Sequence, residues 1–307
     1  MALVTVRNRC YPVSALIVCL ISITAFAVNH YVFRFPGNNY FPPWAWVPGV
    51  YLAIGWLLMR MVLNPHHYIL QVVQNIALLY ASIALIAILT AAVQFTPFQP
   101  IDSMLIVWEQ KLGIDMADIM SWTAQHPLFK TLLIKSYDSI ALQMSLLPFV
   151  LCFFGFTDKL REYYCLMLIS AIIGFVFYYF FPTTAPASNI ISPYFSTEQL
   201  DTGLKFRQIH AYISPTTVDG GMIAMPSFHV IWAWLCLYLS RAWRPLLILF
   251  IPLNILLALS CVLLGWHYPI DLLGSLITIV ITHTIYYRMK NRAEQSTQKI
   301  LAGTPLA

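Results

Sequence analysis

Long apolar segments are the feature that most restricts how this chain can fold. The 307 residues are 60% hydrophobic and 9% charged, which is far more apolar than a soluble domain. Eight apolar stretches, bounded by Pro, Gly, Asn or charged residues, predict membrane spans. They cover residues 13–32, 45–63, 69–95, 139–156, 163–181, 226–240, 245–264 and 270–287. The sequence therefore predicts an all-α, polytopic integral membrane protein, a helical bundle with about eight transmembrane helices.

Two connections between these segments are long and not uniformly apolar. Residues 100–137 mix apolar and charged side chains at helical spacing, which predicts one or two amphipathic helices on the membrane surface. Residues 182–225 are rich in Pro, Ser and Thr and lack a long apolar run, so they are expected to form a polar connection.

The basic residues predict the orientation of the chain. An even number of spans places both termini on one side, which receives eleven of the 17 Lys and Arg residues. Because positive charge is enriched in cytoplasmic loops, the termini are expected in the cytoplasm and both long connections outside. The N-terminal apolar run is expected to be a retained span rather than a cleaved signal peptide. This asymmetry accounts for the net charge of +5, so no nucleic-acid partner is expected.

The cysteines indicate no chemistry of their own. Six are scattered along the chain, mostly inside apolar runs, and their spacing matches neither a disulfide framework nor a zinc site. We therefore expect no metal and no other cofactor.

Residues 224–229, AMPSFH, open the sixth predicted span on the outer face. Pro226 is expected in the first turn of that helix, where its missing N–H is no loss. The free N–H groups of the turn, together with the Ser227 hydroxyl, can form an anion site. His229 is then within reach of a bound phosphate and can protonate a departing alkoxide.

Residues 260–271, SCVLLGWHYPID, lead into the eighth span on the same face. The i, i+4 spacing of His267 and Asp271 predicts that they share one side of a helix. Asp271 can then accept a hydrogen bond from one ring nitrogen and leave the other free to attack. Pro269 is compatible with the first turn of such a helix.

Each of these residues also has an ordinary structural explanation. A histidine near a helix end is commonly an interfacial side chain, Ser227 is a common type of helix cap, and Asp271 can pair with a nearby base. The convergence of two histidines and an acid on one face favours a functional site.

Taken together, the two motifs resemble those of the type 2 phosphatidic acid phosphatase superfamily of membrane lipid phosphatases and phosphotransferases. Its second motif, Pro-Ser-x-His, matches residues 226–229, and its third, Ser-Arg, five residues, His, three residues, Asp, matches Ser260, His267 and Asp271. The resemblance implies that His267 is the nucleophile, forming a phosphohistidine. It also implies that Asp271 orients His267 and that His229 is the general acid.

The departures from this pattern concern positive charge. Cys261 replaces the arginine of the third motif, and the first motif, Lys, six residues, Arg-Pro, is not found. Because a phosphoryl transition state needs cationic stabilisation, we expect Lys205 and Arg207, just ahead of the second motif, to bind the substrate. Arg207 is favoured for its bidentate geometry. The alternative is that both are surface bases that touch lipid headgroups.

The same losses are found in a branch that includes the aureobasidin-sensitive inositol phosphorylceramide synthases of fungi and bacterial relatives. The resemblance covers roughly residues 100–285 and implies a six-helix core with two additional N-terminal helices. It also places Tyr137, Asp138 and Gln143 near the reaction centre as substrate contacts. A Tyr-Asp pair at a membrane interface is alternatively an aromatic anchor beside a solvated acid.

These observations divide the chain into N-terminal transmembrane helices (1–96), a phosphatase-like catalytic core (97–290) and a cytoplasmic tail (291–307). They leave three functions open. The first is hydrolysis of a lipid phosphate or pyrophosphate, and the second is transfer of a phospho-headgroup, of the inositol phosphate type, to a polyol or lipid alcohol. The third is a transporter or scaffold. We expect the bacterial inner membrane as the location, with a membrane lipid as substrate and the active site on the periplasmic face.

Overall fold

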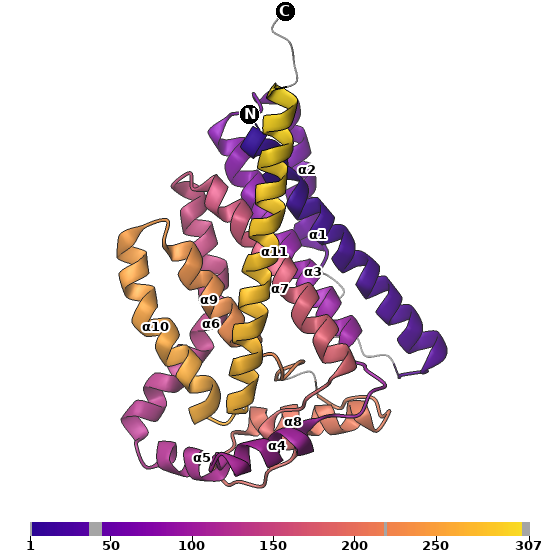
Figure 1. Ribbon diagram of the computed structural model, residues 1–307, viewed down its shortest axis with the longest axis vertical. Coiled ribbons are helices and arrows are strands. Elements are labelled where there is room, and N and C mark those ends of the chain that lie inside the picture. Colours follow the sequence, from indigo (N-terminus) through magenta and orange to yellow (C-terminus); the bar gives the residue numbers. More distant parts are fainter. Residues whose placement is uncertain (1, 37–44, 218–219, 303–307) are drawn as a thin grey trace, which may run out of the picture.

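The computed structural model describes residues 2–36, 45–217 and 220–302, and within these ranges every regular element is helical (Figure 1). The elements are α1 (Ala2–Ala27), a π-helical continuation (Val28–Val32), α2 (Val47–Val62), α3 (Tyr68–Val93), α4 (Asp102–Lys111), α5 (Met116–Ala124), α6 (Pro127–Phe153), α7 (Thr157–Phe180), a 3₁₀ turn (Pro186–Ser188), α8 (Thr197–His210), α9 (Phe228–Ser240), α10 (Arg244–Leu263) and α11 (Pro269–Ala302).

Six helices of this part of the chain are long and apolar enough to cross a membrane. These spans are Cys10–Val32, Tyr68–Val93, Pro127–Phe153, Thr157–Phe180, Arg244–Leu263 and Pro269–Arg292, and the shorter apolar helices are Val47–Val62 and Phe228–Ser240. Each of the eight predicted segments overlaps one of these helices. The prediction of a polytopic helical membrane protein is confirmed.

Helix α7 forms the centre of the bundle. Residues 163–171 are all buried, as expected for a helix that is covered on every side. The helices α1, α3, α9 and α11 pack against it, so two helices of the N-terminal region share a core with the two helices that carry the histidine motifs.

The outer helices present apolar side chains away from the bundle. Ile248 and Leu249 of α10, and Leu273 and Val280 of α11, are more than half exposed. Transmembrane helices present such side chains to lipid, because the bilayer interior is itself apolar. The exposed apolar surface is therefore the expected outer surface of a membrane protein.

Three short helices, α4, α5 and α8, lie across the end of the bundle opposite the chain termini (Figure 1). The first two fall in the segment predicted to form surface helices. That prediction extended too far, because residues 127–137 belong to the long helix α6. Pro127 occupies a first-turn position, where proline is well tolerated, and the helix continues from there without a break to Phe153.

Helix α9 is too short to cross the whole membrane. Its 13 residues extend about 20 Å at 1.5 Å per residue, against about 30 Å of hydrocarbon. A helix of this length can begin below the membrane surface, inside the bundle. Residues 220–227 lead inward to its first turn, where the second motif lies.

Candidate active site

The turn between α10 and α11 places His267. Gly265 has φ of 80°, a left-handed conformation that favours glycine, and it reverses the chain directly after α10. The backbone N–H of His267 then donates to the Cys261 carbonyl at 2.8 Å. Helix α11 begins at Pro269, so the predicted first-turn position of this proline is confirmed.

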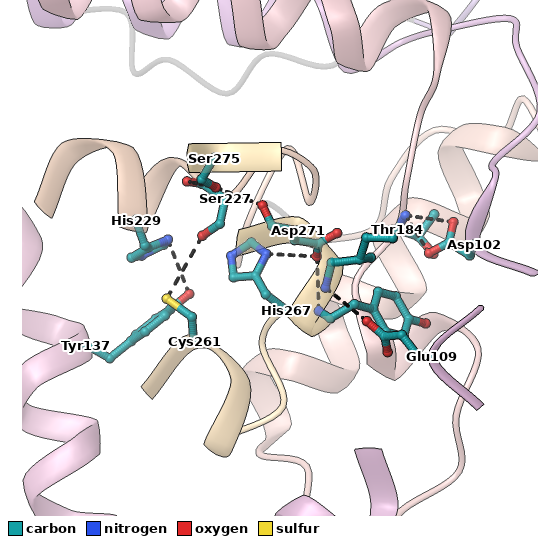
Figure 2. A network of polar contacts seen from close by, with 12 residues as sticks. Asp102, Glu109, Tyr137, Thr184, Ser227, His229, Cys261, His267, Asp271 and Ser275 are labelled. Carbon is teal, nitrogen blue, oxygen red and sulfur yellow. Dashed lines mark hydrogen bonds and ion pairs between the residues drawn. The ribbon is translucent and has the colours of Figure 1, made fainter. Parts of the chain in front are cut away.

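His267 and Asp271 form the buried pair at the centre of Figure 2. His267 Nδ1 lies 3.3 Å from Asp271 Oδ2, and the same oxygen accepts the backbone N–H of Tyr268 at 3.0 Å. The exposed fractions of His267 and Asp271 are 5% and 0%. The expected contact is present, but the two residues do not share a helix, because His267 precedes α11 and reaches Asp271 from the turn.

Burial sets the protonation of His267. Its removal from water lowers the pKa of the ring to about 4, and a hydrogen bond to the Ala224 carbonyl opposes this shift. Burial has this direction because it penalises the charged imidazolium. His267 is therefore neutral at pH 7, the form that a nucleophile requires.

The second motif lies at the start of α9, which begins at Phe228, two residues later than predicted. Ser227 is the N-cap, with an extended backbone (φ −67°, ψ 109°), so Pro226 precedes the helix rather than forming its first turn. The Ser227 side chain makes no capping hydrogen bond. The first-turn N–H groups of a helix have no acceptor within it, so this turn can bind an anion, as the sequence predicts.

Close contacts join the starts of α9 and α11. Ser275 Oγ donates to the Ser227 carbonyl at 3.0 Å and to the Asp271 carbonyl at 2.8 Å (Figure 2). Gly174 of α7 lets the start of α9 pack closely against α7, because a Cβ there would lie 2.7 Å from the Phe228 ring. The two motifs are therefore held in a fixed relation.

Tyr137 stacks between His229 and Trp266. Its ring lies 4.2 Å from that of His229 at 16°, and 5.0 Å from that of Trp266 at 6°. Its hydroxyl is 3.4 Å from His229 Nδ1 (Figure 2). Since α6, α9 and the α10–α11 turn each contribute one ring, the stack restricts the orientation of His229.

The two histidines face one another across a short gap. The ring centroids of His229 and His267 are 6.1 Å apart, with 59° between the planes. A phosphorus atom needs about 3 Å to an attacking atom, so one phosphoryl group can contact both rings. Such an arrangement suits a nucleophile and a general acid on opposite sides of one phosphate.

The other predicted substrate contacts lie around this centre in different ways. Tyr137 is buried within it, whereas Asp138, the next residue on α6, is exposed. Lys205 of α8 is 0% exposed and its Nζ donates to the Gly220 carbonyl at 3.2 Å. Arg207 is exposed and donates through Nη1 to the carbonyls of residues 187 and 188, at 3.2 Å each. Both bases lie on the helix that crosses this end of the bundle.

Cys261 occupies the position of the missing motif arginine. It is fully buried, and its sulfur lies 4.0 Å from Ser227 Oγ. The pair connects the end of α10 to the start of α9 (Figure 2). At this position the chain therefore has a buried, closely packed thiol, whereas the family pattern has a positively charged arginine.

Two buried acids of α4, neither of them expected at the site from the sequence, also reach the centre. Glu109 accepts the backbone N–H of Ile270 at 3.0 Å, and Asp102 accepts the N–H of Thr184 at 2.9 Å (Figure 2). Their exposed fractions are 4% and 2%. In the sequence, each of them is only an acid on a predicted amphipathic helix. An acid in that setting ordinarily lies on the solvent-exposed side of the helix.

An apolar cavity of about 430 Å³ opens onto His229. Its walls come from α3, α6, α7, α9 and residues 221–223. They include Ile83, Ile86, Thr90, Met144 and Trp232. A cavity of this size and lining is typical of sites for small apolar ligands.

The fold and this centre define an integral membrane protein in which a buried histidine–aspartate pair faces a second histidine. Residues 103–285, more than half of the chain, match the family model described as the PAP2 superfamily. The chain therefore belongs to the PAP2 superfamily, whose members are generally phosphatases or phosphotransferases. No curated protein and no solved structure shows a significant match to it.

Proposed function

We propose that the protein hydrolyses a lipid phosphate or pyrophosphate through a phosphohistidine on His267. The observation that carries this proposal is the His267–Asp271 pair, at 3.3 Å, facing His229 at the mouth of an apolar cavity. The pair supplies an oriented nucleophile, His229 supplies a proton donor, and the cavity supplies a place for a hydrocarbon chain.

In the first step, His267 Nε2 attacks phosphorus and a P–N bond forms. Asp271 holds the proton on Nδ1 and stabilises the positive charge that develops on the ring. In a lipid phosphate the bond from phosphorus to the ester oxygen breaks, and His229 donates a proton to the departing alkoxide; in a pyrophosphate the bond to the bridging oxygen breaks, and His229 protonates the departing lipid phosphate. The products of this step are the dephosphorylated lipid and the phosphohistidine.

In the second step, water attacks the phosphohistidine. His229, now deprotonated, accepts a proton from the water as a new P–O bond forms. The P–N bond breaks, and the electron pair returns to His267 Nε2. Inorganic phosphate leaves and both histidines return to their starting states.

Binding of the phosphate is assigned to the start of α9 and to the bases of α8. The first-turn N–H groups and Ser227 suit the phosphoryl oxygens. Lys205 and Arg207 supply positive charge at this end of the bundle, where their charged ends donate to the carbonyls of Gly220 and Ala187. Arg207, being exposed, can turn toward an incoming headgroup.

The cavity supports a lipid as the substrate rather than a soluble phosphate ester. It leads from His229 along α3 and α6, with almost entirely apolar walls. A chain lying in it places the ester oxygen beside His229. Its α3 wall precedes residue 103, where the family match begins, so we expect α3 to take part in binding the lipid.

Transfer to an alcohol is the second candidate. His267 is 5% exposed, and a site that restricts water favours a bound alcohol as the acceptor. Cys261 also matches the arginine-free pattern of the inositol phosphorylceramide synthase branch. In this case a polyol or lipid alcohol replaces water in the second step, and the same histidines act.

The bacterial inner membrane is the proposed location, with cytoplasmic termini and a periplasmic site. Support comes from the distribution of the Lys and Arg residues, of which eleven lie on the terminus side.

The test is a product assay on purified protein with phosphatidic acid and a polyprenyl pyrophosphate in mixed micelles. We expect phosphate release from at least one of them, and its loss in both His267→Ala and His229→Ala. Mass spectrometry with and without added inositol separates the two candidates, since transfer to inositol gives inositol phosphate in place of inorganic phosphate. Substantial activity in both variants contradicts the mechanism.

A further inference from the structure

Helix α4 lies at the surface and sends two carboxylates inward. Ser103, Met104, Val107 and Trp108 are exposed on it, whereas Glu109 is buried. Burying a carboxylate is costly unless it is paired or hydrogen-bonded. Glu109 therefore needs a partner inside the protein, and the structure provides it on the helix that carries the catalytic aspartate.

The first N–H groups of α11 have two acceptors, one of which lies on α4. The first residue of the helix is Pro269, which has no N–H. The N–H of Ile270 donates to Glu109 Oε1 at 3.0 Å, and that of Asp271 donates to the Tyr268 carbonyl at 3.0 Å. Glu109 thus caps this helix from another element, next to the residue that holds His267.

The Asp271 side chain completes the arrangement. Its Oδ2 accepts the N–H of Tyr268, the residue before the helix, as the third residue of a capping box does. The same oxygen contacts His267 Nδ1. The position of α11 therefore sets the position of Asp271 Oδ2, and this oxygen orients the nucleophile.

Asp102 provides a second connection from α4 to the same turn. Both of its oxygens lie 2.9 Å from the N–H of Thr184. Asn189 Nδ2 donates to Thr184 Oγ1 at 2.9 Å and to the Tyr268 hydroxyl at 3.4 Å. Tyr268 is adjacent to His267, so α4 reaches the catalytic turn from both of its ends.

We propose that Glu109 is a positioning residue, which acts through the Ile270 N–H to hold Asp271 and His267 in reacting geometry. Asp102 supports the same turn through Thr184 and Asn189. The inference rests on the proposed function, because it assigns Glu109 a part in the reaction of that site. It makes α4 a structural part of the active site rather than a membrane-surface element.

The test compares three variants in the phosphate-release assay. Glu109→Ala removes the acceptor, Glu109→Gln keeps an acceptor oxygen and removes the charge, and Gln110→Ala changes the exposed neighbour. For Glu109→Ala we expect kcat to fall about 10- to 100-fold, because small misplacements of reacting groups slow a reaction by this much. We expect KM to stay within about twofold of the wild-type value. Glu109→Gln is expected to retain most of the activity, and Gln110→Ala all of it.

Several outcomes overturn the inference. One is that Glu109→Ala has the same kcat as Gln110→Ala. Another is that Glu109→Ala and Glu109→Gln lose equal amounts of kcat. If Glu109→Ala does not fold, Glu109→Asp replaces it, because the shorter side chain keeps the charge and withdraws the acceptor. A folded Glu109→Asp with full kcat also contradicts the inference. An inactive wild type, or an active His267→Ala, instead contradicts the proposed function.

Discussion

Helices α9 and α11 contribute to two clusters that contain histidine, one at the α4 end of the bundle and one nearer the chain termini, and the two clusters differ in chemistry. At the α4 end, His267 is buried beside Asp271 and faces His229 across 6.1 Å. At the terminus end, His283 Nε2 accepts the Trp234 indole N–H at 3.0 Å, and its ring lies 4.6 Å from that of Tyr238. Both clusters combine histidine with aromatic rings, so these residue types alone do not define a site.

The difference lies in where the carboxylate points. Asp271 faces the imidazole of His267, whereas Glu162, the acid of the second cluster, accepts the Tyr238 hydroxyl at 2.5 Å. The Tyr238 hydroxyl also contacts that of Tyr287 at 2.6 Å. The second cluster is therefore a structural network that joins α7, α9 and α11. A histidine near a helix end becomes a candidate nucleophile when a buried acid orients it and a second histidine faces it.

Removal of the nucleophile is the largest expected effect. His267→Ala is expected to lower phosphate release more than about 10⁴-fold, as loss of a nucleophile does in other enzymes. His283→Ala, in the middle part of α11, is expected to leave the rate within about twofold of wild type. Equal losses in a steady-state assay of both purified variants contradict the assignment of the site to the α4 end.

Removal of the orienting charge comes next. Asp271→Asn is expected to lower kcat about 10²- to 10⁴-fold, because the amide holds the wrong tautomer of its histidine partner. The matched change, Glu162→Gln, keeps the acceptor of the Tyr238 hydroxyl and is expected to change kcat little. A larger loss for Glu162→Gln in the same assay reverses the comparison between the two ends.

A smaller effect is expected from a single hydroxyl. Tyr137→Phe keeps the ring stack and removes the contact to His229 Nδ1, so a loss of about 3- to 10-fold in kcat is expected, the equivalent of one ordinary hydrogen bond. Tyr238→Phe makes the same change in the second cluster and serves as the control. If kcat is unchanged in Tyr137→Phe, the Tyr137 hydroxyl does not orient His229.

The smallest expected effect is that of mild acid on the nucleophile. Because burial holds the pKa of His267 at about 4, against about 6.5 for an ordinary histidine, the nucleophilic form persists down to about pH 5. With p-nitrophenyl phosphate, whose leaving group needs no acid, the rate of phosphohistidine formation is expected to stay nearly flat from pH 7 to 5. A tenfold fall of this rate per pH unit below pH 6.5 contradicts the lowered pKa of His267.

The same shift has a consequence for stability, with a definite sign. Between about pH 6.5 and 4 the unfolded chain binds a proton at residue 267 and the folded chain does not. The free energy of unfolding is therefore expected to fall as the pH drops through this window. Thermal unfolding in detergent measures the effect, and His267→Gln is expected to reduce the slope.

Most of the fold followed from local patterns in the sequence. Apolar segments predicted the helices, and the spacing of residues 226–229 and 260–271 predicted which side chains meet. The errors were also local. No break in the sequence separates residues 127–137 from the span that follows, and nothing in it shows that α9 begins at Phe228 rather than at Pro226.

The sequence did not reveal the contacts that hold the centre together. Glu109 and Ile270 are 161 positions apart, and Tyr137 and His229 are 92 apart. Periodicity describes one element at a time, so it predicts that a helix has a buried face but not which residue of another helix that face meets. Glu109 was therefore grouped with the solvent-facing charges of an amphipathic helix, although it is buried against α11.

The phosphohistidine is the most direct test of the account. Rapid acid-free quenching of the enzyme with ³²P-labelled phosphatidic acid or polyprenyl pyrophosphate, followed by peptide mapping under alkaline conditions, locates the labelled residue. The account predicts label on the peptide that contains His267 and no label in His267→Ala. Label on His229, or turnover by wild type and by His267→Ala with no labelled histidine, contradicts it.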